Sequence, residues 1–293
     1  MQIGFVGLGA MGLPMAINIQ KGLNNDNLPS LRVWNRTASK AAPVQELGAI
    51  VETSLESIAK NCQIFFAMTF DDAALQLTVD TIVSNSNSTS KPLFISCSTV
   101  APSLIQSLSA KYLAKITILS APVFGRPDAA LNKQLVAVLA GGTPSEKDIV
   151  SKYLQYTTRK ITILNGPAHT ANVLKLTGNF CIASLIDMLA QAQTLSEKNG
   201  VPREAVVDVV SSLFPGPIVG GYSSRIAVDD FGVGFTVDGG LKDVGLMQEL
   251  ARESGVCLPF ADVVKGHLDR QKGEDPNLDW SSIARVVRKD SGL

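Results

Sequence analysis

The chain of 293 residues contains little of what metal sites and covalent cross-links are made from. It has two histidines and four cysteines, and no two cysteines form a C-x-x-C pair. The cysteines are Cys62, Cys97, Cys181 and Cys257. This spacing argues against a zinc knuckle or a disulfide framework and is typical of a reducing compartment. We therefore expect no metal site.

The sequence also lacks an excess of charge and a long apolar run. Its 26 basic residues balance its 26 acidic residues, so no net field attracts the chain to nucleic acid or to an anionic membrane. No apolar run approaches the roughly 18 residues of a membrane span, and no basic leader precedes the strand-like start at Ile3. We expect a cytoplasmic protein whose partner is a small molecule, with neither nucleic acid nor a membrane as a partner.

Short β-branched segments alternate with helical patterns over the first 165 residues, as in a doubly wound parallel sheet. The polar segment from Ser84 to Ser90 indicates a surface loop. We predict strands at Gln2–Val6, Leu31–Trp34, Ala49–Val51, Gln63–Met68, Leu93–Ser96, Ile116–Leu119, Leu135–Leu139 and Ile161–Leu164.

The pattern changes after Pro167. From Ala168 to Lys198 apolar residues recur at helical spacing, and Asn199-Gly200 is typical of a helix C-cap. We therefore predict an α/β protein with two domains, a Rossmann domain over residues 1–164 and an all-helical domain over residues 165–293. The helical half has many apolar faces, and we expect it to hold substrate and to make the subunit contacts of a homodimer or a larger homo-oligomer.

A glycine-rich turn follows the first strand. Gly7-Leu8-Gly9-Ala10-Met11-Gly12 has the G-x-G-x-x-G spacing and leads directly into a predicted helix. In a dinucleotide-binding site the first glycine permits the tight turn, the second admits the pyrophosphate, and the third lets the helix pack on the strand. A merely tight turn between strand and helix is the less favoured alternative. We predict that these six residues bind a dinucleotide.

The end of the second strand favours NADP(H) over NAD(H). Enzymes that use NAD usually place an acidic residue there to hold the ribose 2′-hydroxyl. This chain has Asn35, Arg36 and Thr37 instead, and Arg36 can form charge-assisted bonds to a 2′-phosphate. The alternative is that Arg36 is only a solvated residue at the start of a helix.

The run from Gly4 to Asn18, GFVGLGAMGLPMAIN, closely resembles the opening of the β-hydroxyacid dehydrogenases, and shorter matches continue over nearly the whole chain. The family includes 3-hydroxyisobutyrate dehydrogenase and the glyoxylate/succinic semialdehyde reductases. The resemblance implies an oxidoreductase that transfers a hydride between a nicotinamide cofactor and a small aldehyde, keto acid or 3-hydroxy acid. It also implies that Met68, Thr69 and Thr99 line the cofactor site and that Ser98 lies at the substrate. A helix cap by Ser98 or Thr99 is the alternative.

The segment after the sixth strand departs from the family. Val123 and Gly125 match a motif that holds the substrate carboxylate, but Phe124 and Arg126 replace a serine and a glycine. We expect all four residues to line the substrate pocket. Either Arg126 forms a bidentate pair with the substrate carboxylate, or it pairs with Asp128 and has no role in substrate recognition.

Lys175 and Asn179 are four residues apart and share one face of the long helix. By resemblance they are the catalytic lysine and its partner asparagine, and both also contact substrate. An ammonium group can protonate a developing alkoxide if burial lowers its pKa. His169 lies on another face and is expected to be structural or to lie beside the cofactor.

Lys242 lies in a segment, Leu241-Lys242-Asp243, that resembles one whose lysine reaches the cofactor. A solvated lysine paired with Asp243 is the alternative.

Two other functions stay open for the whole chain. One is an imine reductase, which Lys175 argues against and Phe124 and Arg126 leave possible. The other is a dinucleotide-binding scaffold without catalysis.

Overall fold

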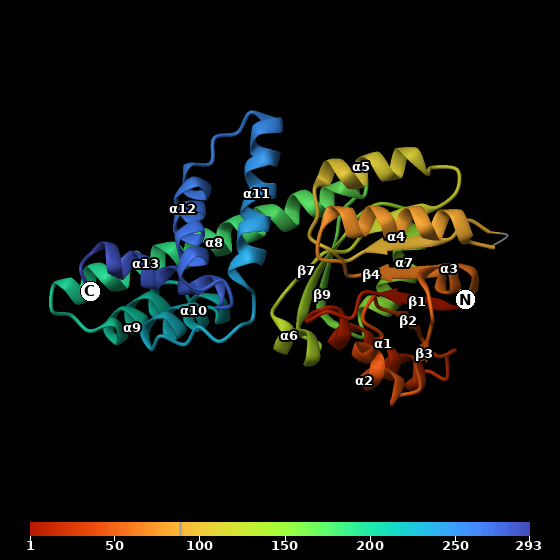
Figure 1. Ribbon diagram of the computed structural model, residues 1–293, viewed down its shortest axis with the longest axis horizontal. Coiled ribbons are helices and arrows are strands. Elements are labelled where there is room, and N and C mark those ends of the chain that lie inside the picture. Colours follow the sequence, from red (N-terminus) through yellow and green to blue (C-terminus); the bar gives the residue numbers. More distant parts are fainter. Residues whose placement is uncertain (88–89) are drawn as a thin grey trace. The chain divides into compact units, whose positions relative to one another are not determined.

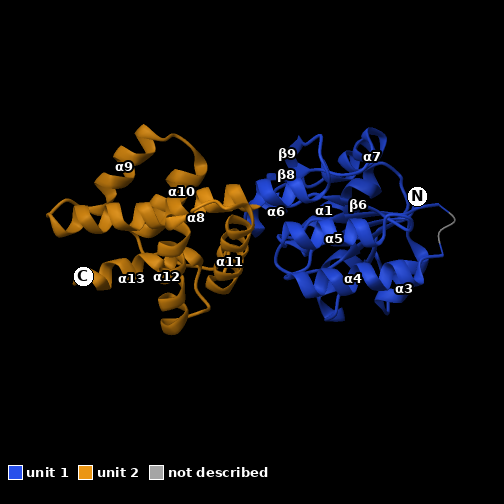
Figure 2. Cartoon of the chain, turned by 90° about the horizontal axis from the view of Figure 1, so that it is seen from above, with its two compact units in different colours: residues 1–175 blue, residues 176–293 orange. Residues whose placement is uncertain are grey.

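The computed structural model describes residues 1–87 and 90–293, so residues 88 and 89 of the expected polar loop lie outside the described residues. The chain forms two compact units, Met1–Lys175 and Leu176–Leu293 (Figure 2). The division falls inside one long helix, whereas we expected the domain boundary at residue 164, just before it. The first two turns of this helix, up to Lys175, belong to unit 1.

Unit 1 is built on a six-stranded parallel sheet with the order β3-β2-β1-β4-β5-β6 (Figure 1). The chain runs outward from β1 in one direction and then restarts at β4 in the other, so a topological switch point lies between these two strands. The strands β1, β4 and β5 are buried along their whole length, as expected for a sheet covered on both faces. The strands are β1 (Ile3–Val6), β2 (Arg32–Trp34), β3 (Ile50–Val51), β4 (Ile64–Ala67), β5 (Leu93–Ser96) and β6 (Thr117–Ser120).

Helices connect these strands and cover the sheet. Asp71 caps α4 and Ser54 caps α3, each by accepting a hydrogen bond from a backbone N–H of the first turn. Apolar residues from both faces of the sheet form two buried clusters. The helices are α1 (Gly12–Asn25), α2 (Ala42–Gln45), α3 (Leu55–Asn61), α4 (Asp72–Asn85), α5 (Pro102–Lys111), α6 (Pro127–Leu131) and α7 (Pro144–Leu154).

A second, three-stranded sheet corrects the prediction of a single parallel sheet. Its order is β7-β8-β9, formed by β7 (Val123–Phe124), β8 (Leu135–Leu139) and β9 (Thr158–Ile163). β7 pairs antiparallel with β8 and was not predicted as a strand. It has only two residues, between Pro122 and Gly125, so its pairing comes from a tertiary contact that no local pattern reveals.

Unit 2 is helical, as predicted, and packs around the long helix α8 (His169–Lys198). Gly200 adopts the left-handed conformation after this helix, with φ of 76°, as the C-cap prediction required. Leu176, Leu189 and their apolar neighbours form the core of this unit. The other helices are α9 (Arg203–Leu213), α10 (Pro217–Ala227), α11 (Val237–Ser254), α12 (Pro259–Glu274) and α13 (Ile283–Asp290).

By length and composition alone, α8 is apolar enough to cross a membrane, although no uninterrupted apolar run in it does so. Its buried residues contribute to the core of unit 2, and they include the polar side chains Asn179, Asp187 and Gln193. Asp187 receives hydrogen bonds or ion-pair contacts from Gln191 and His267. Buried, paired polar groups facing neighbouring helices are the signature of a core helix.

Candidate active site

The glycine-rich loop between β1 and α1 is tight enough to require glycine at two positions. Gly7 has φ of 93°, and a Cβ placed there would lie 2.2 Å from the carbonyl oxygen of Met68. A Cβ on Gly12 would lie 1.9 Å from the carbonyl oxygen of Gly7. Any larger side chain would therefore push the loop off the ends of β1 and β4.

Gly9 is different, because nothing in the protein lies within 4 Å of a Cβ placed on it. Gly9 and Ala10 are exposed at the start of α1, and Met11 is half-buried. The protein itself therefore does not require a glycine at Gly9, whereas a group lying against the bare backbone would. An N-terminal helix end attracts phosphate through its free N–H groups and its dipole, so the loop fits a dinucleotide pyrophosphate.

Asn35, at the end of β2, braces this loop. Its Oδ1 accepts a hydrogen bond of 2.8 Å from the backbone N–H of Leu8, and its Nδ2 donates one of 2.8 Å to the carbonyl of Thr37. Leu8 is 1% exposed and its N–H is used by this bond, so both residues help to fix the conformation of the loop. Arg36 and Thr37 are exposed beside them.

The loops after β4 and β5 are joined to each other. The hydroxyl of Ser98 accepts a hydrogen bond of 2.7 Å from the backbone N–H of Thr69 and lies 3.0 Å from the Thr69 hydroxyl. Ser98 is fully buried, and its hydroxyl links the two loops. Thr99 and Met68 are half-buried at the same edge. Burial raises the pKa of the neighbouring Cys97 thiol to about 12, which makes a thiolate nucleophile unavailable there.

Lys175 is buried, with 6% of its surface exposed, and its Nζ lies 4.1 Å from the centre of the Phe124 ring. This cation–π contact brings together the expected catalytic lysine and the residue that departs from the family. Gly125 has φ of 136°, and a Cβ on it would lie 2.6 Å from the side chain of Leu135, so a larger residue in its place would be strained. Val123 is buried and Arg126 is half-buried on either side.

In unit 2, Asn179 and Lys242 converge on a carboxylate whose importance the sequence did not reveal. The Nδ2 of Asn179 donates a hydrogen bond of 2.6 Å to Oδ2 of Asp243 on α11. The Nζ of Lys242 lies 2.9 Å from Oδ1 of Asp243, which is 1% exposed. The pairing of Lys242 with Asp243 is thus present, but the carboxylate is buried and also orients Asn179. The spacing of the Leu241-Lys242-Asp243 segment was the only available signal for it.

The two histidines of the chain lie in different units. His169 is the first residue of α8 and is half-buried. His267 in unit 2 hydrogen-bonds to Asp187 at 2.7 Å, and this bond raises the pKa of the imidazole.

The fold and the glycine-rich loop define the class of protein, a dinucleotide-binding protein with a Rossmann unit and a helical unit. Residues 2–166 match the family model described as the NAD binding domain of 6-phosphogluconate dehydrogenase. Residues 170–287 match the model described as the NAD-binding region of NADP-dependent 3-hydroxyisobutyrate dehydrogenase. The chain belongs to the β-hydroxyacid dehydrogenase family, which confirms the resemblance found in the sequence.

Relatives cover essentially the whole chain. The mitochondrial 3-hydroxyisobutyrate dehydrogenase of Drosophila melanogaster is 26% identical over 98% of this chain and 90% of its own length. The Mycobacterium tuberculosis 3-hydroxyisobutyrate dehydrogenase solved with L-serine superposes with a TM-score of 0.84 at 22% identity, covering 98% of this chain and all of that one. A reductive aminase from Aspergillus terreus, solved with NADPH and ethyl-5-oxohexanoate, reaches a TM-score of 0.62 at 20% identity over 98% and 99%. These structural similarities show the shared fold.

Proposed function

We propose that the protein is an NADP(H)-dependent reductase of small aldehydes or keto acids, which runs in reverse as a 3-hydroxyacid dehydrogenase. The observation that carries this proposal is the buried Lys175 held against Phe124, in the same unit as the glycine-rich loop. Burying a lysine lowers the stability of the fold, since the charged ammonium group must be desolvated, so its burial suggests a functional role. Near a hydride donor, the same burial suits a proton donor.

The residues that would hold the cofactor lie along the carboxyl edge of the parallel sheet. Gly7 to Gly12 would bind the pyrophosphate, and Arg36 with Thr37 would hold the adenosine 2′-phosphate. Thr69 and Thr99, after β4 and β5, would border the remaining half. When bound, NADPH supplies the hydride.

Lys175 would donate a proton to the carbonyl oxygen of the substrate as negative charge develops on it, and would take the proton back in the direction of oxidation. The ring of Phe124 excludes water from one side of the ammonium group and stabilises its charge. Asn179 follows one helical turn later on the same face of α8, with its amide orientation fixed by Asp243. An oriented neutral amide can hold the reacting oxygen or the lysine without adding charge.

The role of Arg126 as the cation of the proposed substrate pocket can be tested by substitution. If Arg126 binds a substrate carboxylate, Arg126→Ala should raise KM for acidic aldehydes and keto acids by about 10- to 150-fold, the value of a charge-assisted hydrogen bond. KM for neutral aldehydes should change little, and 3-hydroxyisobutyrate should be a poor substrate beside the best one. Steady-state kinetics on matched acidic and neutral substrates measure this. An equal change for both classes would assign Arg126 a structural role.

One screen separates the candidate functions. NADPH oxidation is followed spectrophotometrically with semialdehydes, keto acids and cyclic imines. We expect turnover of the carbonyl compounds. Turnover restricted to the imines would establish C=N reduction, for which the aromatic Phe124 in place of a small residue is the supporting observation. NADPH binding without turnover of any class would leave a dinucleotide-binding scaffold.

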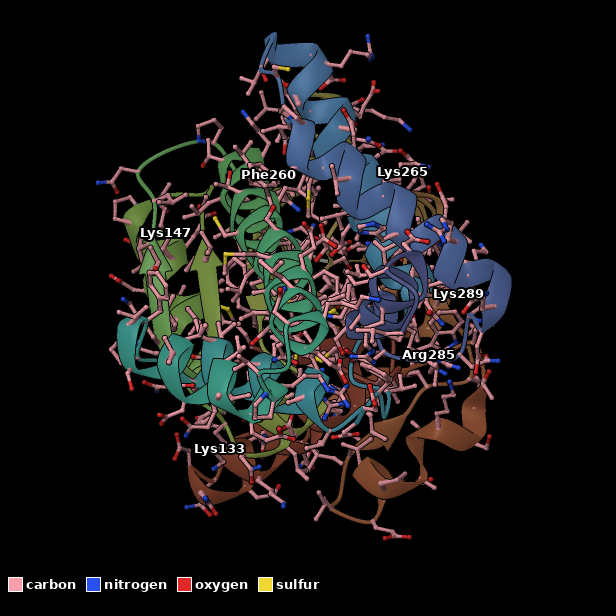
Figure 3. The ribbon with its side chains drawn as sticks, turned by 90° about the vertical axis from the view of Figure 1, so that its left-hand side faces the viewer. Lys133, Lys147, Phe260, Lys265, Arg285 and Lys289 are labelled. Atoms are coloured by element: carbon pink, nitrogen blue, oxygen red, sulfur yellow. The ribbon has the colours of Figure 1, made fainter. Side chains whose placement is uncertain are left out.

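We also propose a homodimer formed through unit 2. Cys181, Met188 and Leu195 are exposed at seven-residue spacing along α8, the repeat by which two helices pack. α9 and α12 lie on opposite sides of this helix (Figures 1 and 3), and Phe260 and Val263 on α12 are also exposed. Leu195 of α8 and Val263 of α12 line one surface pocket, and exposed apolar residues gathered in this way are typical of a subunit interface.

Introducing a charge into this surface should separate the subunits. Leu195→Glu should convert the dimer to a monomer at micromolar concentration, because an unpaired carboxylate would be buried. Leu113→Glu in unit 1, at a leucine that is 71% exposed, is the matched control and should remain dimeric. Sedimentation velocity distinguishes the two states. A wild-type monomer, or a Leu195→Glu dimer, would exclude this interface.

A further inference from the structure

Besides the hydroxyls of Ser96 and Ser120, which end β5 and β6, one further buried polar atom near the carboxyl edge of the sheet of unit 1 has no hydrogen-bond partner among the described residues. It is Oδ1 of Asn172, a residue that is 1% exposed and lies three positions before Lys175 on α8. The Nδ2 of the same amide donates to the backbone carbonyl of Ser98, after β5, across a long 3.4 Å. A buried acceptor that water cannot reach destabilises the free protein, so its presence is explained if a ligand brings the donor.

The sheet order indicates which part of the ligand comes near this atom. The pyrophosphate loop follows β1, and Arg36 follows β2 on the adenosine side. A dinucleotide lies across the switch point between β1 and β4, so its other half extends over the ends of β4 and β5. Ser98 follows β5 and is the residue that Asn172 contacts.

We propose that Asn172 is a cofactor-binding residue whose Oδ1 accepts a hydrogen bond from the carboxamide NH2 of the nicotinamide. This inference rests on the proposed function, since it requires a nicotinamide dinucleotide as the ligand. The torsion of an asparagine amide is broad, and the bond to Ser98 is long, so the amide can rotate toward the ligand without moving α8. Asn172 then contacts the carboxamide of the nicotinamide, while Arg36 contacts the 2′-phosphate at the opposite end of the cofactor.

The test compares NADP+ with its 3-acetylpyridine analogue, in which a methyl group replaces the amide NH2 and the carbonyl is kept. Dissociation constants are measured by titration calorimetry without substrate. The wild type should bind NADP+ about tenfold more tightly than the analogue, as one hydrogen bond to a buried acceptor implies. Asn172→Leu, similar in size but without the acceptor, should bind the two about equally.

Two controls keep the result interpretable. The fragment 2′-phospho-ADP-ribose lacks the nicotinamide and should bind equally to the wild type and to Asn172→Leu, which shows that the variant is folded. Asn165→Leu, at an exposed asparagine shortly before α8, should discriminate as the wild type does. If Asn172→Leu does not fold, Asn172→Ser replaces it and carries the same expectation.

The outcomes are separable. Equal affinity of the wild type for NADP+ and the analogue overturns the inference, whatever the variants do. Undiminished discrimination by Asn172→Leu overturns it too, and a raised substrate KM in that variant would then place Oδ1 at the substrate. Failure of the wild type to bind either dinucleotide or the fragment would instead refute the proposed function.

Discussion

Replacing Lys175 with alanine should lower kcat by about 10²–10⁴, the usual range for the loss of a positioned proton donor. Lys175 is buried against the Phe124 ring, and its proposed role is to protonate the developing alkoxide. NADPH affinity should barely change, because the phosphates and the ribose are expected to be held at Gly7–Gly12 and Arg36. The measurement is steady-state kinetics together with a cofactor titration on the same protein.

Two further substitutions separate proton transfer from packing. Lys175→Met keeps a long unbranched side chain against Phe124, so the fold should be retained while kcat falls as it does for alanine. Lys175→Arg should not restore activity, because a guanidinium holds its proton too tightly. Asn179→Ala should be milder, since the proton source stays in place. If Lys175→Met binds NADPH and keeps most of its kcat, the proton comes from elsewhere, and His169 is the next candidate.

The elements of the fold that could be predicted are those with a regular hydrophobic pattern in the sequence. The six strands of the parallel sheet and the long helix α8 were located to within a residue or two, since buried parallel strands and an amphipathic helix each leave a repeating pattern. The second sheet was missed because β7 has two residues and pairs antiparallel with a strand that follows it by a helix and a turn. Such a pairing depends on where Gly125 turns the chain, which no periodicity encodes.

The residues of the candidate site likewise fall into those that the sequence predicts and those that it does not. Residues whose role depends on backbone shape, such as Gly7 and Gly12, could be found from their spacing. Residues whose role depends on a distant partner could not. Asn35 binds Leu8, 27 positions away, and Asp243 binds Asn179, 64 positions away. In both cases the sequence identified the residue or its segment, and only the folded chain shows which of its polar atoms already forms a hydrogen bond within the protein.

The second large effect concerns the choice of cofactor. NADPH should bind about 10- to 150-fold more tightly than NADH, the equivalent of at least one charge-assisted hydrogen bond from Arg36 to the 2′-phosphate. Arg36 is exposed at the carboxyl end of β2, and its neighbour Asn35 is engaged with Leu8 and Thr37. Of these residues Arg36 is therefore the one whose charge can reach the phosphate. Titration of both cofactors at fixed ionic strength measures the ratio.

Arg36→Asp should narrow or invert this preference, because a carboxylate repels the 2′-phosphate and can instead accept hydrogen bonds from the ribose hydroxyls. Arg36→Lys keeps the charge but loses the planar two-pronged donor, so it should retain part of the preference. Arg159→Asp, at an exposed arginine on β9, makes the same charge change away from the loop and should leave the ratio unaltered. Added salt should reduce the wild-type ratio, since the arginine is exposed and its attraction to the phosphate is screened. Equal affinity of the wild type for NADPH and NADH would show that the basic residue after β2 has no part in the choice, and Arg36 would then be an ordinary solvated side chain.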